Sequence, residues 1–306
     1  MAPTSLIFLF TLHCPLECEH CIVDSSPRRK EGLANDFVLN AIDEAAAAGI
    51  TSVGFTGGDP FSRRDDLAAF VRKAKDHAMD VMVVTSAFWA RSEALAVRHL
   101  SRVEGIDLLG LSTDVYHHRF TPLANIANAI RAAKQCRIPV ELQVVYTEDE
   151  QVESIREALG DDLVGVQVRR QKLWPVGRAA KYQAAALKTA PNLDDLDMTC
   201  PMGAPVITPD RKLKGCCSSL LNLGSQNPLI LANLEEQTLK AALFEGTRMK
   251  HYQFLRTFGL APVVELIRRA NKADALAAKY TDVCHLCHDI HSQPPLAALI
   301  RETFQG

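Results

Sequence analysis

The sequence predicts an α/β fold in which strand-like runs alternate with amphipathic helical stretches. Alternating strands and helices of this length are typical of βα units built around a parallel sheet. Six units are too few for a closed eight-stranded barrel, so we expect an open, partial (β/α)6 TIM-like barrel. The six strand-like runs are residues 5–12, 52–56, 81–85, 107–112, 140–146 and 164–170.

The helical stretches between these runs carry apolar residues at positions i, i+3, i+4 and i+7, which is the spacing of one helix face. This face is Val38, Ala41, Ile42 and Ala45 in one stretch and Leu67, Phe70, Val71 and Ala74 in another. The alternation stops at about residue 170, and the turn-forming residues Ala190, Pro191 and Asn192 then mark a boundary. We therefore expect two domains, a barrel at residues 1–190 and a smaller domain at residues 191–306.

The composition is that of an ordinary globular protein of 306 residues, with 47% hydrophobic and 23% charged residues. The net charge is −2, from 34 basic and 36 acidic residues, so no basic field indicates a nucleic-acid partner. The apolar run at residues 6–12 is too short to span a membrane and lacks a basic n-region. Nine cysteines without a secretory signal favour metal or redox chemistry in the cytoplasm.

Three of these cysteines follow the first strand-like run directly, with the spacing C-x3-C-x2-C. They are Cys14, Cys18 and Cys21. A loop of this length can bring three thiolates to one soft metal centre, and three ligands leave one corner of a four-iron cluster open for chemistry. A structural zinc knuckle or part of a disulfide framework is the alternative. Zinc loops favour a matching second C-x2-C pair, and none lies nearby.

The second strand-like run ends in Gly57, Gly58, Asp59 and Pro60. Glycines at such a position let the backbone approach a ligand closely, and proline fixes the chain after the turn. Alone, this tetrapeptide would indicate only a turn. Together with the cysteine loop one strand earlier, it resembles the radical S-adenosylmethionine (SAM) superfamily, in which Asp59 would replace the usual glutamate.

This resemblance implies that the open iron takes the amino and carboxylate groups of SAM and that the glycine motif holds the amino group. Reductive cleavage of SAM would then yield methionine and a 5′-deoxyadenosyl radical. The other strand ends become candidate SAM contacts, although serine and aspartate there are equally expected as helix N-caps. These candidates are Ser86, Ser112, Asp114, Gln143 and Arg170.

A second group of cysteines occupies the C-terminal third of the chain. A predicted hairpin with a Pro-Asp turn would bring Cys200 and Cys216 together, and a distant C-x2-C pair, Cys284 and Cys287, would complete a tetrahedral site. Spacing alone gives zinc equal weight here. The layout resembles the Twitch and SPASM auxiliary domains, which implies a second [4Fe-4S] cluster, although Arg211 stands where those families often have glycine.

Further motifs along the chain resemble the radical SAM peptide epimerases, which convert L-residues of ribosomally made peptides to D-residues. These motifs are residues 55–58, Phe88-Trp89, residues 114–117, Val176-Gly177-x-Ala-Ala, Cys200-Pro201 and residues 216–218. Such an enzyme needs a hydrogen donor on the face of the substrate opposite the radical. Neighbours on a strand point to opposite sides, so one thiol of Cys216 and Cys217 would bind the cluster and the other would stay free. The auxiliary-domain pattern implies that Cys216 is the ligand and Cys217 the donor. Exchanged roles, or a buried filler role for Cys217, are the alternatives.

We therefore expect a radical SAM peptide epimerase that uses SAM, two [4Fe-4S] clusters, a ribosomal precursor peptide and an external electron donor. One alternative is a radical SAM enzyme that forms a ring, through a thioether or a C–C bond. A non-enzymatic alternative is a binding scaffold stabilised by zinc. Of the remaining cysteines, Cys136 follows a predicted helix and is expected to be structural.

Overall fold

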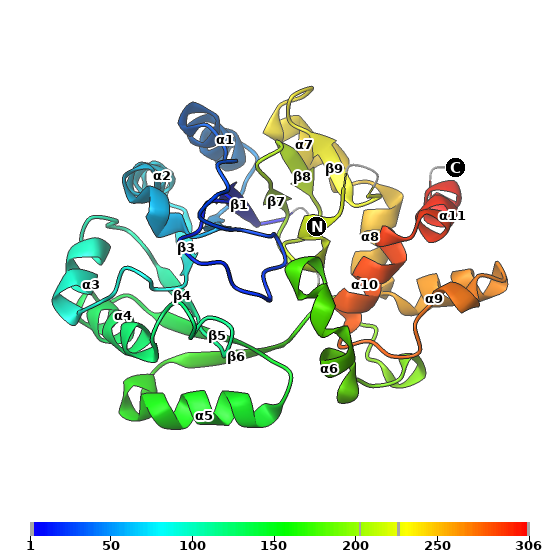
Figure 1. Ribbon diagram of the computed structural model, residues 1–306. Coiled ribbons are helices and arrows are strands. Elements are labelled where there is room, and N and C mark those ends of the chain that lie inside the picture. The colour runs from blue at the N-terminus through cyan, green and yellow to red at the C-terminus, as the bar shows by residue number, and fades with distance from the viewer. Residues whose placement is uncertain (1–2, 202, 225–226, 305–306) are drawn as a thin grey trace.

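The computed structural model describes residues 3–201, 203–224 and 227–304. Its first half is the predicted alternation, in which six parallel strands lie side by side and five helices cover their outer face (Figure 1). The strands are β1 Ser5–Thr11, β2 Ser52–Gly57, β3 Asp80–Thr85, β4 Leu108–Ser112, β5 Val140–Tyr146 and β6 Gln167–Lys172. The helices are α1 Asn35–Ala47, α2 Arg64–Asp76, α3 Glu93–Leu100, α4 Leu123–Gln135 and α5 Asp149–Leu159.

The apolar faces predicted for the first two helices are confirmed, because the buried residues of α1 include all four predicted ones and those of α2 do too. They pack against an aromatic cluster on the strands. Phe8 and Phe55 stack with ring centroids 5.5 Å apart, and Phe70 of α2 meets Phe10 edge-on at the same distance. This core fixes where β1 and β2 end, and those ends carry the two sequence motifs.

The sheet does not close, which confirms the partial barrel. Its strand order is β6-β5-β4-β3-β2-β1-β7-β8-β9, so the three short strands of the C-terminal third extend the barrel sheet. They are β7 Val206–Ile207, β8 Lys212–Lys214 and β9 Ile230–Asn233. β7 runs parallel to β1 and is fully buried, so it covers an edge that would otherwise offer unpaired backbone groups. The sequence did not predict this pairing.

The hairpin between β7 and β8 is confirmed, and Arg211 in its turn adopts the left-handed conformation with φ of 55°. Arg211 therefore occupies the conformation that glycine adopts most easily. Cys136 is the C-cap of α4 and packs against the main core.

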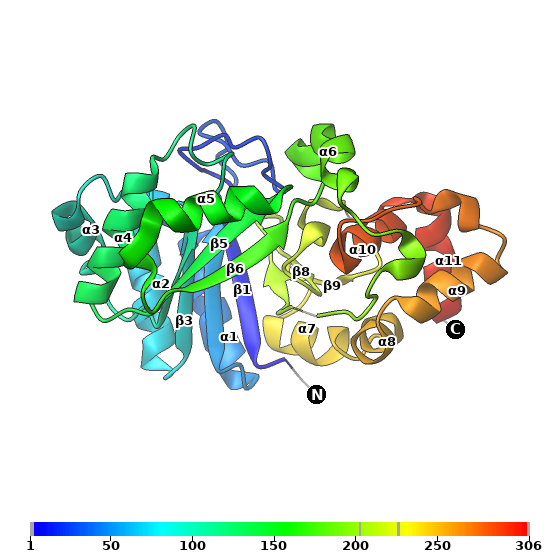
Figure 2. The ribbon, with the colours of Figure 1, turned by 90° about the horizontal axis from the view of Figure 1, so that it is seen from below.

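Helices α6 Gln183–Lys188, α7 Leu239–Gly246 and α8 Lys250–Phe258 lead to α9 Ala261–Arg269, α10 Val283–Ser292 and α11 Pro294–Phe304. Figure 2 shows these last helices, α8 to α11, gathered beside the barrel, next to β8 and β9. No helix among the described residues is both long enough and apolar enough to cross a lipid bilayer.

Candidate functional site

The loop that follows β1 brings the three cysteines of the first motif to the carboxyl ends of the barrel strands. Cys14, Cys18 and Cys21 line one cavity of about 280 Å³ together with the end of β2. Backbone amides approach two of the sulfurs, with Leu16 N at 3.4 Å from Cys14 Sγ and Ser25 N at 3.4 Å from Cys21 Sγ. Three thiols around a shared space, two of them with amide donors, fit the three protein ligands of an iron–sulfur cluster.

Burial disfavours the thiolate form at this site. It raises the pKa of Cys14 to about 12 and also raises the pKa of Cys18. A bound cation would reverse this preference, because a metal ion stabilises the thiolate that coordinates it. These buried cysteines therefore suit metal ligation better than they suit nucleophilic chemistry as free thiols.

The two glycines at the end of β2 are required by the close approach of the cysteine loop. A Cβ atom on Gly57 would lie 2.3 Å from Thr11 O, and one on Gly58 would lie 2.0 Å from His13 O. Gly58 N donates to Thr11 O at 2.6 Å and Asp59 N to His13 O at 3.0 Å. The motif thus locks β2 against the loop, and Gly57 and Gly58 also line the cavity.

Asp59 does not line this cavity; it joins the ends of β2 and β3. Its fully buried carboxylate accepts hydrogen bonds from Ser86 N at 2.8 Å, Ser86 Oγ at 2.7 Å and Thr85 Oγ1 at 2.9 Å. Burial raises the pKa of Asp59, although these hydrogen bonds act in the opposite direction. Pro60 begins a 3-10 turn and is buried. Asp59 and Pro60 therefore support the residues that line the cavity without lining it themselves.

The other expected contacts are distributed over two connected spaces. Ser86 and Ser112 line the cysteine cavity, and Ser112 also lines a deeper space inside the barrel. Asp114 and Gln143 line only the deeper space. A ligand that touched all four would have to reach from the cysteine loop into the barrel.

Arg170 lies elsewhere than we expected. It is on the outer face of β6, where it pairs with Asp149 of α5 and lies over the ring of Tyr146. Its neighbours Arg169 and Gln171 face the barrel interior instead. The sequence placed this strand at residues 164–170, and a strand has a period of two, so an error of one residue exchanges the inner and outer faces.

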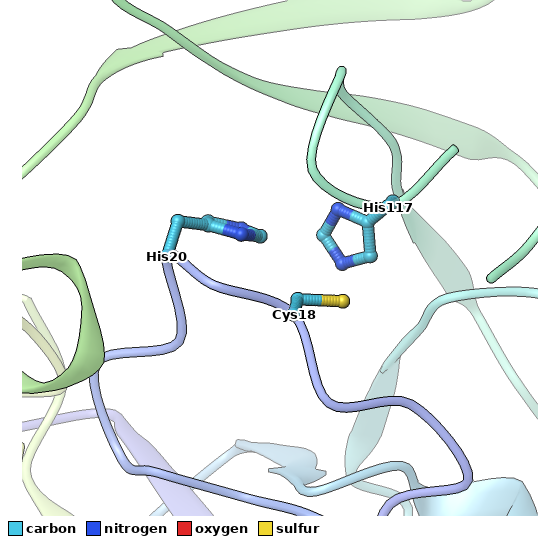
Figure 3. Close-up of side chains that lie close together, drawn as sticks. All are labelled: Cys18, His20 and His117. Atoms are coloured by element: carbon cyan, nitrogen blue, oxygen red, sulfur yellow. The ribbon is translucent and has the colours of Figure 1, made fainter. Parts of the chain in front are cut away.

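A buried cluster beside the cysteine loop was not found from the sequence. Asp114 lies between two histidines, at 3.3 Å from His20 Nε2 and 2.9 Å from His117 Nδ1. Figure 3 shows His20, His117 and Cys18 pointing toward one another from two separate loops. The cluster ties the loop after β4 to the cysteine loop, and Tyr116 stacks on His20.

The charges of this cluster follow from burial and pairing. Burial lowers the pKa of His20 to about 4. Burial alone would raise the pKa of Asp114, but the two histidines lower it to about 2. Burial also opposes charge on His117, yet the Asp114 carboxylate raises the pKa of His117. The arrangement therefore favours a charged pair of Asp114 and His117 beside a neutral His20.

Arg178 is a second residue to which the sequence analysis assigned no role. Its guanidinium donates to Cys18 O at 2.9 Å and Ser25 O at 2.5 Å and pairs with Asp24 at 2.7 Å. Gly177 has a φ of 59°, and a Cβ there would lie 2.6 Å from Ile22 O. The segment of Gly177 and Arg178, at the end of the barrel, therefore packs closely against the cysteine loop and forms hydrogen bonds with it.

The four cysteines of the second group meet as the sequence predicted. Cys200, Cys216, Cys284 and Cys287 all line one apolar cavity between the hairpin and α10. The last two lie one turn apart near the start of α10, so their thiols share a helix face. Apart from Ser218, the side chains in the rest of the wall are mainly apolar, among them Leu220, Leu229, Tyr252, Leu255 and Leu260. Four thiols in an apolar setting fit either zinc or a cluster with complete protein ligation.

Cys216 and Cys217 face different cavities. Cys216 faces the four-cysteine cavity, whereas Cys217 lines both the cavity of Cys14, Cys18 and Cys21 and the deeper space in the barrel. Burial raises the pKa of Cys217 to about 12, so its thiol keeps its proton at neutral pH. The structure thus brings one free thiol to the space that the cysteine loop borders.

Comparisons with known proteins agree with this architecture. The family model described as "Radical SAM superfamily" matches residues 8–161. The putative peptide biosynthesis protein YydG of Bacillus subtilis is 22% identical over 90% of this chain and 88% of its own. The PqqA peptide cyclase of Ruegeria pomeroyi is 31% identical over 37% of this chain and 31% of its own.

Among solved structures, the SAM-bound SuiB of Streptococcus suis aligns with a TM-score of 0.55 at 14% identity, over 84% of this chain and 68% of that one. At this identity the likeness concerns the fold alone. The family match covers half of the chain and includes both N-terminal motifs. The chain belongs to the radical SAM superfamily, whose members use SAM and a [4Fe-4S] cluster.

Proposed function

We propose that this protein modifies a ribosomally synthesised peptide by converting one L-residue to its D-form. The similarity to YydG spans nearly the whole chain and supports a peptide as the substrate. We assign Cys14, Cys18 and Cys21 to the SAM-binding cluster and residues 1–190 to the SAM-cleaving barrel. We assign Cys200, Cys216, Cys284 and Cys287 to an auxiliary cluster within residues 191–306.

The orientation of Cys217 is the observation that carries epimerisation. When bound, the cluster and SAM supply a 5′-deoxyadenosyl radical, which takes one hydrogen atom from a substrate carbon. Inversion then requires a hydrogen atom from the opposite face. A thiol can give it because the S–H bond is weak, and Cys217 is a protonated thiol that lines the same cavity as the cysteine loop.

The electron balance of this step is defined. Cys217 transfers a hydrogen atom to the substrate Cα, which forms one C–H bond and leaves a sulfur radical on the protein. One electron from the external donor and one proton from solvent then restore the thiol. A second electron is used for each cleavage of SAM. Since a thiol exchanges its hydrogen with water, the new Cα hydrogen would come from solvent.

Substitution of Cys217 tests the proposal. Cys217→Ala and the nearly isosteric Cys217→Ser should retain both clusters and SAM cleavage but form no D-residue from the precursor peptide. The matched control is Cys136→Ala, which removes a cysteine outside both cavities and should epimerise normally. In heavy water the wild type should place one deuterium on the product Cα, measured by mass spectrometry after hydrolysis. Solvent-labelled D-product from Cys217→Ala would reject Cys217 as the donor.

Ring formation is the second candidate, because part of the chain is similar to PqqA peptide cyclases. The same assay separates the two reactions by mass. Epimerisation leaves the mass of the peptide unchanged, whereas closing a ring removes two hydrogen atoms. The non-enzymatic alternative, a binding scaffold stabilised by zinc, does not agree with membership of the radical SAM superfamily.

A further inference from the structure

The open edge of strand β6 has the properties of a docking strand. The sheet order ends at β6 on one side and at β9 on the other. Only the β6 end borders the space that Cys217 lines. β6 is also the most exposed barrel strand, since none of its six residues is buried, whereas five of the seven residues of β1 are.

Backbone geometry shows which groups face this open side. Leu173 N donates to Tyr146 O of β5 at 2.9 Å. Alternate residues of a strand direct their backbone groups to the same neighbour, so those of Arg169 and Gln171 also face β5. The N–H and C=O groups of Val168 and Arg170 then face away from β5. Lys172 O, on this same side, accepts a hydrogen bond from the Gln171 side chain.

The inner face of β6 leads into the proposed reaction space. Arg169 and Gln171 line the deeper space in the barrel together with Gly203 and Cys217 from the opposite side. An added strand would lie about 4.8 Å from β6, and every second side chain of that strand would point into the barrel. Such a strand would therefore carry one of its own residues past Cys217.

The charge of β6 also favours an extended peptide as the occupant. The strand reads Gln-Val-Arg-Arg-Gln-Lys, with three basic and no acidic residues. Arg169 is 63% exposed and has Glu141 at 3.9 Å as its ion-pair partner. Charged residues on an edge strand can also serve only to prevent aggregation, and that reading predicts no peptide pairing.

We infer that the substrate peptide binds by adding a strand to the open edge of β6, with the backbone groups of Val168 and Arg170 as its partners. Main-chain hydrogen bonds would then hold any sequence of suitable shape, and Arg169 would favour an acidic side chain. This inference rests on the proposed function, because it assigns how the peptide substrate of that site is held.

The probe is a display library of random 12-residue peptides, selected for binding to the cluster-loaded enzyme with SAM and no reductant. The best binder is then resynthesised with an N-methyl group at each position in turn. Strand addition predicts losses with a period of two over several residues, since only alternate N–H groups face β6. A scan without this period, or a library that yields no binder, would overturn the inference.

A matched pair of variants tests the position. Arg170→Ala removes the side chain but keeps the N–H group, whereas Arg170→Pro also removes the N–H group that faces the open side. Proline at an outward-facing edge position leaves the ladder to β5 intact. Arg170→Pro should bind the peptide about tenfold more weakly than Arg170→Ala. Equal affinities would overturn the inference.

Two readouts separate this inference from the proposed function. Peptide-independent cleavage of SAM should be the same in both Arg170 variants and the wild type, which shows that the barrel is intact. A peptide that binds with the period of two but yields no D-residue would reject epimerisation alone. A peptide that is epimerised without this pattern of binding would reject docking on β6 alone.

Discussion

The two cysteine cavities differ in what surrounds their sulfurs. The N-terminal cavity has the three thiols of the cysteine loop, the separate thiol of Cys217, about 280 Å³ of space, and strand-end glycines and serines in its wall. The C-terminal cavity has four thiols enclosed by apolar side chains of α8, of α10 and of the segment between β8 and β9. Three ligands with adjoining space suit a metal that binds an outside molecule, whereas four ligands in an apolar shell suit a closed site. The comparison thus predicts which site cleaves SAM.

Removing the N-terminal thiols should have the largest effect. The triple change Cys14, Cys18 and Cys21 to alanine should abolish formation of 5′-deoxyadenosine under dithionite, because no open cluster position remains. Iron should fall from about eight to about four per chain, the content of the remaining four-thiol site. The readouts are chromatography of the cleavage products and iron analysis. Retained cleavage of SAM would contradict the assignment of the two cavities.

Removing a thiol of the C-terminal cavity should have a smaller effect than removing the N-terminal thiols, because SAM cleavage should be retained. Cys284→Ala or Cys287→Ala should also lower iron from about eight to about four per chain. SAM cleavage without peptide should continue, because the N-terminal cavity is unchanged. Cys136→Ala serves again as the control and should keep all of the iron. If the anaerobic wild type holds one zinc per chain instead, the closed site is structural.

The sequence predicted those features of the two sites that depend on local pattern. The spacing of Cys14, Cys18 and Cys21 and the helical C-x2-C pair place thiols together within a single segment. Helix faces were predicted for the same reason, since residues three and four apart share a face. Cys216 and Cys217 face different cavities as predicted, but both lie beyond the end of β8, so strand alternation is not the reason.

Features that join distant segments could not be read from the sequence. The pairing of β7 with β1 joins residues about 200 positions apart, and no local pattern indicates it. The contact of His20 with Asp114 also depends on how two loops meet. Arg170 was misplaced because the period of two along β6 does not show by itself which of two adjacent residues faces the barrel interior. In each case tertiary packing determines a pairing, a contact or a side-chain direction that the local sequence pattern does not specify.

The smallest of these effects concerns how the N-terminal loop is held. Apolar side chains, including those of α8, enclose the C-terminal cysteines. The loop of Cys18 and Cys21 instead receives hydrogen bonds from Arg178. Its guanidinium is 19% exposed and bonds to Cys18 O, Ser25 O and Asp24. Arg178→Ala leaves these acceptors without their charged donor, at a cost of about 2 kcal/mol in the free energy of unfolding.

The destabilisation by Arg178→Ala should affect mainly the N-terminal site of Cys14, Cys18 and Cys21. Under an iron chelator, Arg178→Ala should lose the N-terminal cluster several-fold faster than the wild type, while the C-terminal site keeps its metal. Arg178→Lys should recover only part of the difference, because an ammonium group cannot reproduce the fork of a guanidinium. Release of iron, followed by absorbance in each single-site variant, measures the two rates. Equal rates of iron loss from both sites would mean that Arg178 stabilises the whole fold rather than this loop. The two cavities would then not differ in how their cysteine-bearing segments are stabilised.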